Sequence, residues 1–218
     1  MTTLLDELQR TGWTVVRALG QDRDSLEQDV TTIAGSLGTL AGMRDRHPVQ
    51  ALSPYPSDVA RASSLSRKYG LGTFPFHCDT AHWPVPCRFV VLGCLEPGQT
   101  PAYTTLLDTQ RLQLTAREKA LAEQSLFFVR NGRKSFYASI LSPRRSFARV
   151  DPGCLEPCSD DAAEALSLFA PADGHPATAR VMLEKGDVLV IDNWRTLHGR
   201  EAVSAPDSNR ELLRSIVL

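Results

Sequence analysis

Two short segments carry the residue types from which proteins build metal centres. His77 and Asp79 stand two positions apart at the end of the segment 74–79, and on a strand such positions point to the same face. His198 follows the apolar segment 186–192 and a turn, which predicts an exposed histidine. Two histidines and one carboxylate form the facial triad found in non-haem Fe(II) oxygenases, which leaves coordination positions open. The three residues are therefore the predicted metal ligands and the predicted catalytic centre.

The same residues also have simpler interpretations. A His-x-Asp pattern is common by chance, so His77 and Asp79 could form an ion pair at the end of a strand. His198 could equally be a histidine of a capped turn. Among the other histidines, His82 is the rival ligand because it stands three residues past Asp79. A metal centre is favoured only if other residues point to the same chemistry.

Two arginines near the end of the sequence supply that further indication. Arg210 and Arg214 stand four positions apart on the last predicted strand, so we expect both to face the same side. Two guanidinium groups that point together into a barrel are costly unless anions meet them. A carboxylate is the natural partner, because it accepts two parallel hydrogen bonds from an arginine. The alternative is that one arginine, more readily Arg214, pairs with an internal Asp or Glu.

Composition limits the classes of protein to which the chain can belong. With 218 residues, of which 42% are hydrophobic and 22% charged, we expect one domain with a substantial core. The net charge of -1 offers no basic face for nucleic acid. No apolar run approaches the roughly 18 residues of a membrane span, and the start MTTLLDELQR lacks the basic and apolar regions of a signal peptide. We therefore expect a cytoplasmic protein that binds neither nucleic acid nor membranes, with its five cysteines reduced.

Hydrophobic periodicity predicts many short strands with a few peripheral helices. Strands are predicted at 12–19, 88–96, 125–130, 133–141, 145–150, 179–183, 188–192 and 211–217. Helices are predicted at 25–37, from the capping pattern Thr115-x-x-Glu118 to residue 124, and at 161–169. Turns are predicted at Asn131-Gly132 and Lys185-Gly186, each joining two neighbouring strands. This pattern favours a mainly β sandwich or jelly roll over a doubly wound sheet.

The motifs taken together resemble a known family. His77-x-Asp79, Thr104, His198 and Arg210 are similar in type and order to the Fe(II)/2-oxoglutarate dioxygenases of the taurine dioxygenase-like (TauD/TfdA) family. The resemblance is carried by the segments FPFHCDTAHWPVPCRFVVLGCLEPG, TTLLD and GDVLVIDNWRTLHGREAV…NRELLR. It implies a mainly β fold with flanking helices and a double-stranded β-helix (jelly-roll) core, formed by residues 1–218 as a single domain.

The resemblance also implies how the site residues would act. Fe(II) would be bound by His77, Asp79 and His198. Arg210 with Thr104 would hold the distal carboxylate of 2-oxoglutarate, with Thr105 as the neighbouring alternative. Arg214 would lie near the metal-proximal carboxylate of the cofactor or near an acidic group of the substrate.

The implied reaction consumes O2 and a small-molecule substrate and releases succinate and CO2. Related halogenases carry a small residue at the position of Asp79, so the carboxylate favours oxygenation here. The outcome would be hydroxylation, desaturation or ring formation on a small polar substrate, amino-acid-like or a natural-product intermediate. Candidate pocket walls are Phe76, Trp83, Tyr103 and Trp194.

Two other functions remain open from the residues. A zinc-dependent cupin-like hydrolase could use the same triad with an activated water, although it leaves Arg210 and Thr104 unexplained. A catalytically inactive jelly-roll binding module is the second alternative.

The segment between Thr104 and His198 is shorter than is usual in the family, so the pocket is open or is completed by a partner or by a second subunit of a homo-oligomer.

Overall fold

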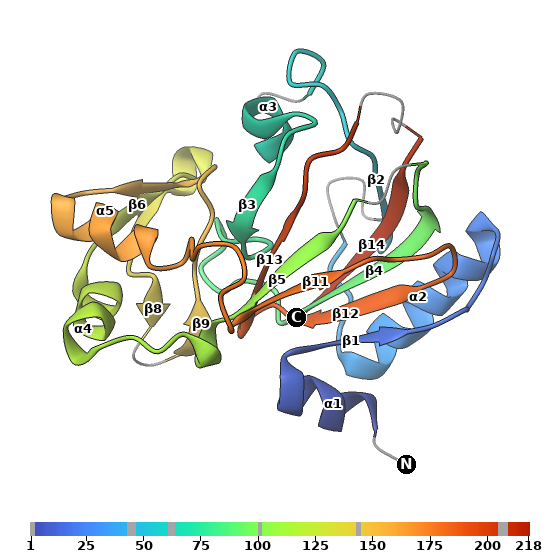
Figure 1. The fold of residues 1–218 in the computed structure, drawn as a ribbon, viewed down its shortest axis with the longest axis horizontal. Coiled ribbons are helices and arrows are strands. Elements are labelled where there is room, and N and C mark those ends of the chain that lie inside the picture. Colours follow the sequence, from blue (N-terminus) through green and yellow to red (C-terminus); the bar gives the residue numbers. More distant parts are fainter. Residues whose placement is uncertain (1–2, 43–46, 61–63, 100–101, 143–144, 205–208) are drawn as a thin grey trace.

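Two antiparallel sheets form the main body of the protein (Figure 1). The computed structural model describes residues 3–42, 47–60, 64–99, 102–142, 145–204 and 209–218. The larger sheet has the strand order β1 (Trp13–Val16), β12 (Val188–Asp192), β4 (Phe89–Glu96), β14 (Glu211–Val217) and β2 (Gln50–Leu52). The smaller sheet has the order β11 (Thr178–Val181), β5 (Thr104–Asp108), β13 (Thr196–Arg200) and β3 (Phe74–His77).

Alternating side chains along β4 build a core on each face of the larger sheet. Val90 and Leu92 point between the two sheets and pack in one buried cluster with Leu106 of β5. Val91, one position out of phase, belongs to a second buried cluster on the outer face. Neighbouring residues of a strand point to opposite faces. A strand that is covered on both faces is therefore apolar throughout, as the sequence of β4 is.

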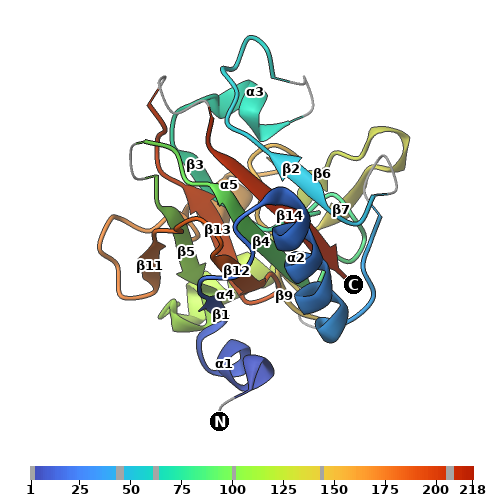
Figure 2. The ribbon, with the colours of Figure 1, turned by 90° about the vertical axis from the view of Figure 1, so that its right-hand side faces the viewer.

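Helix α2 (Arg23–Leu37) covers the outer face of the larger sheet, in front of β4, β12 and β14 in Figure 2. The residues that it buries share one face of the helix: Leu26, Val30 and Ala34. The helix begins behind Asp22, whose side chain accepts a hydrogen bond from the backbone amide of Ser25. The helix therefore begins at Arg23, two residues before the predicted start at residue 25, and the predicted end at residue 37 is confirmed.

A second group of elements packs against the outer face of the smaller sheet, on the left in Figure 1. It comprises α4 (Ala116–Gln124), β6 (Phe127–Val129), β7 (Phe136–Ala138), β8 (Leu141–Ser142), β9 (Arg145–Ala148), β10 (Leu155–Pro157) and α5 (Asp160–Ser167). Its buried cluster includes Leu107 of β5 and Leu197 of β13. Apolar packing therefore also covers the outer face of the strands that carry the predicted site.

Several predicted elements are confirmed, and strands exceed helices as expected for a mainly β protein. The capping pattern is present, since Thr115 and Glu118 cap each other at the start of α4. The predicted strands 188–192 and 211–217 match β12 and β14. The turn at Asn131-Gly132 does connect two paired strands, but through a short 3-10 helix, η2 (Gly132–Lys134). The strands 179–183 and 188–192 are not a hairpin, because β11 and β12 belong to different sheets.

Several elements were not expected from the sequence. These include the helices α1 (Leu4–Thr11) and α3 (Leu65–Tyr69), the 3-10 helices η1 (Thr109–Arg111) and η2, and the strands β2, β5, β10 and β13. Strand β13 has the largest consequence for the site, because a turn and an exposed histidine were predicted where the chain forms a buried strand. The prediction that His198 is exposed is therefore wrong. The histidine is buried because β13 pairs with a strand on each side.

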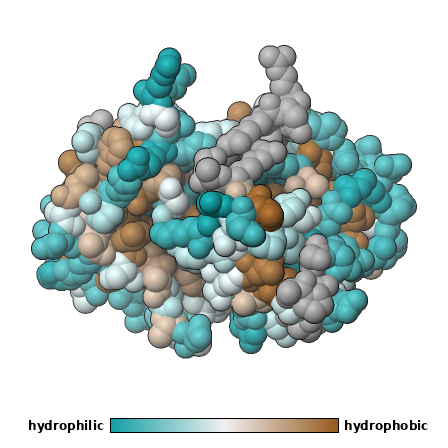
Figure 3. Space-filling model, turned by 90° about the horizontal axis from the view of Figure 1, so that it is seen from above, coloured by the Kyte–Doolittle hydropathy of each residue, from teal (hydrophilic) through white to brown (hydrophobic). Residues whose placement is uncertain are grey.

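The face of the molecule seen from above carries both hydrophobic and hydrophilic residues. Hydrophobic patches there are interrupted by hydrophilic residues (Figure 3). The large exposed hydrophobic side chains among the described residues come from separate parts of the chain: Leu5, Tyr55, Val59, Val85, Leu126, Tyr137, Met182 and Leu218. Within the described ranges, no helix is both long enough and apolar enough to cross a membrane.

The contact between α2 and β4 generates a stability prediction at Gly93. A Cβ atom at this position would lie 2.6 Å from Val30 Cγ2 and 3.2 Å from Leu26 Cδ1, closer than side chains normally approach. Overpacking of a close-packed core displaces its neighbours. We expect Gly93→Ala to lower the free energy of unfolding by about 1–3 kcal/mol, measured by urea denaturation.

The matched control is Gly35→Ala within α2. A Cβ atom there would lie 3.8 Å from Leu40 Cδ1, which is ordinary contact. Alanine is favoured over glycine inside a helix, so this variant is expected to be more stable than the wild type by about 0.5–1 kcal/mol. A Gly93→Ala protein as stable as the wild type would contradict the close approach of α2 to β4.

Candidate metal centre

The register between two strands brings the two predicted histidines together. β3 and β13 pair antiparallel, with His77 directly opposite His198. Their ring centroids are 4.5 Å apart. Ligand atoms of His77, Asp79 and His198 all lie within 4.8 Å of one another, a spacing comparable to that of donors about 2 Å from a shared ion. The rival ligand His82 is outside this group.

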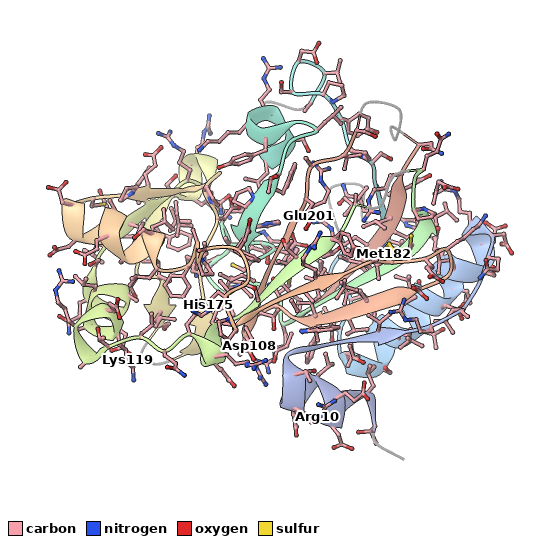
Figure 4. All side chains as sticks on the ribbon, viewed as in Figure 1. Arg10, Asp108, Lys119, His175, Met182 and Glu201 are labelled. Atoms are coloured by element: carbon pink, nitrogen blue, oxygen red, sulfur yellow. The ribbon has the colours of Figure 1, made fainter. Side chains whose placement is uncertain are left out.

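The strand pair that carries the site can be followed in the side-chain view. Figure 4 labels Asp108, the last residue of β5, and Glu201, the residue after β13. Because β5 and β13 run antiparallel, these two residues mark opposite ends of the pair, and His198 lies between them, opposite Leu106. The site is therefore placed within a sheet that has apolar packing on its outer face.

The two imidazole rings are suited to bind a metal in their neutral form. His77 Nδ1 lies 3.0 Å from the carbonyl oxygen of Pro75. A proton on Nδ1 donated to that oxygen leaves the lone pair of Nε2 for a metal. His198 is only 7% exposed, and its Nδ1 has no hydrogen-bond partner among the described residues. Burial, reinforced by His77, lowers the pKa of His198 to about 3, which keeps that ring neutral.

The carboxylate of Asp79 is buried but remains ionised. Burial alone would raise its pKa, but Arg214 and the two histidines outweigh burial and hold the pKa of Asp79 below its usual value. Arg214 Nη1 lies 2.9 Å from both carboxylate oxygens, and Arg214 Nη2 donates to Gln50 Oε1 at 2.8 Å. Arg214 therefore pairs with an internal acid, which was the alternative interpretation of this residue. A negative carboxylate and two neutral imidazoles are a donor set that fits Fe(II).

A cationic region lies beside this group along β13. Arg210 is only 3% exposed, and its Nη1 donates to the carbonyl oxygen of Pro97 at 3.1 Å. Burial, with a smaller contribution from Arg210, lowers the pKa of Arg200 to about 10. Arg200 stands two residues after His198 on β13, and therefore on the same face. Arg200 is not among the predicted site residues, although its place two positions after His198 in the sequence is a signal that indicates it.

The register also distinguishes the two candidate threonines. Thr104 of β5 lies opposite Arg200 and is buried, which places its side chain on the face shared by Arg200 and His198. Thr105 lies opposite Gly199, and a Cβ atom on Gly199 would meet Thr105 Oγ1 at 2.8 Å, on the other face. Of the two threonines, Thr104 is therefore the one on the same face as His198.

The placement of Arg210 and Arg214 differs in detail from the prediction. Arg210 precedes β14, and the register shifts between Glu211 and Leu212, so regular alternation does not connect the two arginines. Arg214 nonetheless pairs with Asp79, and Arg210 lies close enough to Arg200 to lower the pKa of that residue.

The four aromatic candidates for the pocket wall have structural contacts. Phe76 and Trp83 pack against two of the buried clusters. Trp194 Nε1 donates to the carbonyl oxygen of Pro86 at 3.0 Å, and the Tyr103 ring lies 4.1 Å from the Arg180 guanidinium carbon. Phe76 packs in the cluster on the outer face of the smaller sheet, so its side chain lies on the side opposite to that of His77. A role of the other three toward substrate stays a prediction.

Two histidines and one carboxylate between antiparallel sheets are the arrangement of mononuclear non-haem iron enzymes. Comparison with known families makes the class specific. The model of the taurine catabolism dioxygenase TauD, TfdA family matches residues 107–216, which are 110 of the 218 residues. The chain therefore belongs to the TauD/TfdA family, and family membership makes it an Fe(II)- and 2-oxoglutarate-dependent dioxygenase. The matched part includes His198, Arg210 and Arg214 and begins after His77 and Asp79.

Solved structures show the same fold. A structure described as asparagine oxygenase with Fe(II), 2S,3S-3-hydroxyasparagine and succinate has 20% identity and a TM-score of 0.76, over 98% of this chain and 77% of that one. The non-haem iron oxygenase OrfP with Fe and alpha-ketoglutaric acid has 20% identity and a TM-score of 0.71, over 97% of this chain and 76% of that one. A comparison with curated protein sequences gives no significant match.

The buried histidine generates a prediction for the metal-free protein. Because the folded-state pKa of His198 is about 3 against 6.5 ordinarily, the unfolded chain takes up a proton first as the pH falls below about 6.5. The free energy of unfolding then falls by up to about 1.4 kcal/mol per pH unit, or by about 2 kcal/mol between pH 6.5 and 5. His198→Gln is expected to remove this component, measured by urea denaturation of chelator-treated protein across that range.

An internal control is available at higher pH. Between about pH 7 and 8 His198 is neutral in both folded and unfolded chains, so wild type and His198→Gln should change stability in parallel there. Equal pH dependence of the two proteins below pH 6.5 would show that the ring takes up its proton in the folded state.

Proposed function

We propose that this dioxygenase binds Fe(II) through His77, Asp79 and His198 and oxidises a small amino-acid-like substrate. The observation that carries the proposal is the convergence of the three side chains within 4.8 Å. The two facing antiparallel sheets support a double-stranded β-helix, or jelly-roll, as the core that holds them. When bound, Fe(II) supplies the activation of O2 that is coupled to conversion of 2-oxoglutarate to succinate and CO2.

The cationic region supports a site for 2-oxoglutarate. Arg210 would bind the distal carboxylate by charge-assisted hydrogen bonds, with the hydroxyl group of Thr104 as a second donor. Both residues are buried, so the charge of the cofactor would be met where water screens it little. Arg200, directly opposite Thr104 and two residues after His198, adds positive charge to the same region.

Arg214 supports recognition of a second anionic group. Its Nη1 and Nη2 atoms are occupied by Asp79 and Gln50, while its Nε is buried with no hydrogen-bond partner among the described residues. A carboxylate of the cofactor or of the substrate would satisfy that donor. This arrangement orients an anion beside the triad and keeps Asp79 ionised at the same time.

Similar proteins suggest the substrate class. The names of the solved structures refer to hydroxylated asparagine and to (3S)-hydroxy-L-Arg, both amino acids. These proteins share only about a fifth of their residues with this chain, so the proposal extends to an amino-acid-like or natural-product molecule and not to a particular one. Hydroxylation is the outcome we propose, with desaturation and ring formation as the related outcomes.

The proposal also covers how the protein is organised. We infer that residues 1–218 form a single domain, that the enzyme acts in the cytoplasm, and that a second copy of a homo-oligomer can complete the pocket. The solved structures named above are matched over 76–78% of their length, so part of each has no counterpart here. Size-exclusion chromatography with light scattering measures the oligomeric state directly.

The two halves of the proposed site can be separated by mutation. His77→Ala is expected to abolish Fe(II) binding, because one of three ligands is lost. Arg210→Ala is expected to raise the 2-oxoglutarate concentration needed for half-maximal succinate release by at least about tenfold, since a charged hydrogen bond contributes about 1.5–3 kcal/mol. Anaerobic calorimetry with each ligand measures both affinities.

The control is Arg130→Ala. This change removes an exposed arginine that pairs with Glu156, in the group of elements on the outer face of the smaller sheet. This variant should bind both ligands as the wild type does. If Arg210→Ala weakened Fe(II) binding as much as it weakened 2-oxoglutarate binding, the division of roles would be wrong.

Oxygen dependence tests the reaction class and the substrate together. Loaded with Fe(II) and 2-oxoglutarate, the protein is expected to release succinate faster when a true substrate is present, so a screen of amino acids and their derivatives can be read as succinate formed. Turnover should stop under nitrogen. A zinc-dependent hydrolase would instead keep its activity without oxygen, and an inactive binding module would bind ligands without forming succinate.

A further inference from the structure

Asp79, the proposed carboxylate ligand, lies beyond the end of the strand that carries His77. Strand β3 ends at His77, and the next backbone amide, that of Cys78, donates to Val150. The ladder that fixes His77 against His198 therefore does not extend to Asp79. Another part of the molecule must hold the backbone of this residue, because a metal ligand has to be fixed in position relative to the other two.

The side chain of Asn193 provides the missing contacts. Asn193 Oδ1 accepts a hydrogen bond from the Asp79 amide at 2.8 Å, and Asn193 Nδ2 donates to the Asp79 carbonyl at 3.1 Å. The same Nδ2 also donates to the carbonyl of Cys87 at 2.8 Å. A carboxamide has both a donor and an acceptor, so it can pair with the two backbone groups of one residue as a neighbouring strand would.

The chain around Asp79 needs such a restraint. Thr80, the next residue, has a φ of 57°, a conformation that is unfavourable for a threonine. Its hydroxyl group donates to the Asp79 carbonyl at 2.7 Å and accepts from the Cys87 amide at 2.7 Å. Asn193 and Thr80 thus enclose Asp79 in a buried hydrogen-bonded turn, and Asn193 itself is 1% exposed.

Asn193 also belongs to the segment that places the other histidine. It follows β12 directly and stands five residues before His198, in the turn that leads into β13. The backbone amide of Asn193 donates to the carbonyl of Arg88, which fixes the turn to the start of β4. One side chain therefore connects the backbone of one proposed ligand to the turn that introduces another, across 114 residues of sequence.

We infer that Asn193 is a positioning residue that sets Asp79 relative to the two histidines and so sets the metal affinity of the site. The inference rests on the proposed metal ligands. Asn193 touches neither metal nor substrate in this role and acts through the backbone of Asp79. Partners of ligands in other metal sites change metal affinity by about 10- to 100-fold when they are mutated.

The test measures metal binding rather than turnover. Purified, chelator-treated protein is titrated anaerobically with Co(II), which substitutes for Fe(II) and reports ligand geometry through its visible absorption. Asn193→Ala is expected to raise the dissociation constant of Co(II) by about tenfold or more and to alter the spectrum of the bound ion. Asn193→Asp keeps the acceptor for the Asp79 amide and loses the hydrogen bonds that Nδ2 donates, including the one to the Asp79 carbonyl, so it should also weaken binding.

Thr196→Val is the matched control for loss of a buried hydrogen bond in the same segment. Thr196 is fully buried, and its hydroxyl group donates to the Gly12 carbonyl at 3.1 Å without touching Asp79. This variant should lose thermal stability and keep the Co(II) affinity and spectrum of the wild type. Equal weakening of Co(II) binding by Thr196→Val would overturn the inference, as would wild-type affinity and spectrum in the Asn193 variants.

The two levels of proposal can fail separately. If the wild type bound no Co(II), or if His77→Ala left its binding intact, the proposed metal centre itself would fail. If His77→Ala abolished binding while both Asn193 variants bound normally, only the role of Asn193 would fail. Should neither Asn193 variant fold, hydrogen exchange in the wild type decides, because the Asp79 amide should exchange slowly and rapid exchange contradicts its contact with Asn193.

Discussion

The backbone hydrogen bonds that pair β13 with β3 and β5 determine whether His198 is a site residue at all. Successive side chains of a strand point to opposite faces, so a shift of one residue would turn His198 outward and Leu197 inward. Leu197 is fully buried in the apolar cluster on the outer face, whereas His198 faces His77 on the inner one. Because β13 is fixed by a neighbour on each side, such a shift would disrupt both ladders and bury an imidazole among apolar side chains. The fold thus protects the register that the site requires.

The balance of charge around the triad suits anionic ligands. Arg214 is neutralised by Asp79, whereas Arg200 donates to the backbone carbonyls of Gly70 and Gly72. Carbonyl oxygens carry partial charges and compensate a buried guanidinium only in part, which is why the pKa of Arg200 falls. A dicarboxylate such as 2-oxoglutarate would bring the opposite charge to this region. The positive charge of Arg200 is therefore a structural reason to expect an anionic cofactor in addition to a metal.

Local patterns predicted those parts of the fold that are decided locally. The capping pattern of Thr115 and Glu118 predicted the start of α4, and apolar runs predicted β12 and β14. Helix caps and buried strands can be predicted because their signals lie in adjacent residues. Strand β13 was missed because its sequence, TLHGR, contains a glycine and three polar residues. It is a strand because its neighbours pair with it. Likewise, a turn at Lys185-Gly186 looks the same in sequence whether the next strand joins the same sheet or the opposite one.

The candidate site shows the same division between local and long-range causes. The spacing rule for strands correctly grouped Asp79 with His77, although the reason differs, since β3 ends before Asp79 is reached. If β3 continued, Asp79 would lie opposite Thr196, but β3 ends at His77 and the amide of Cys78 donates to Val150 instead. The chain therefore leaves the sheet at Cys78, turns at Thr80 in a conformation that costs about 1–2 kcal/mol, and is stabilised there by hydrogen bonds from Asn193. Contacts across more than a hundred residues decide where this carboxylate stands, and no window of adjacent residues contains that information.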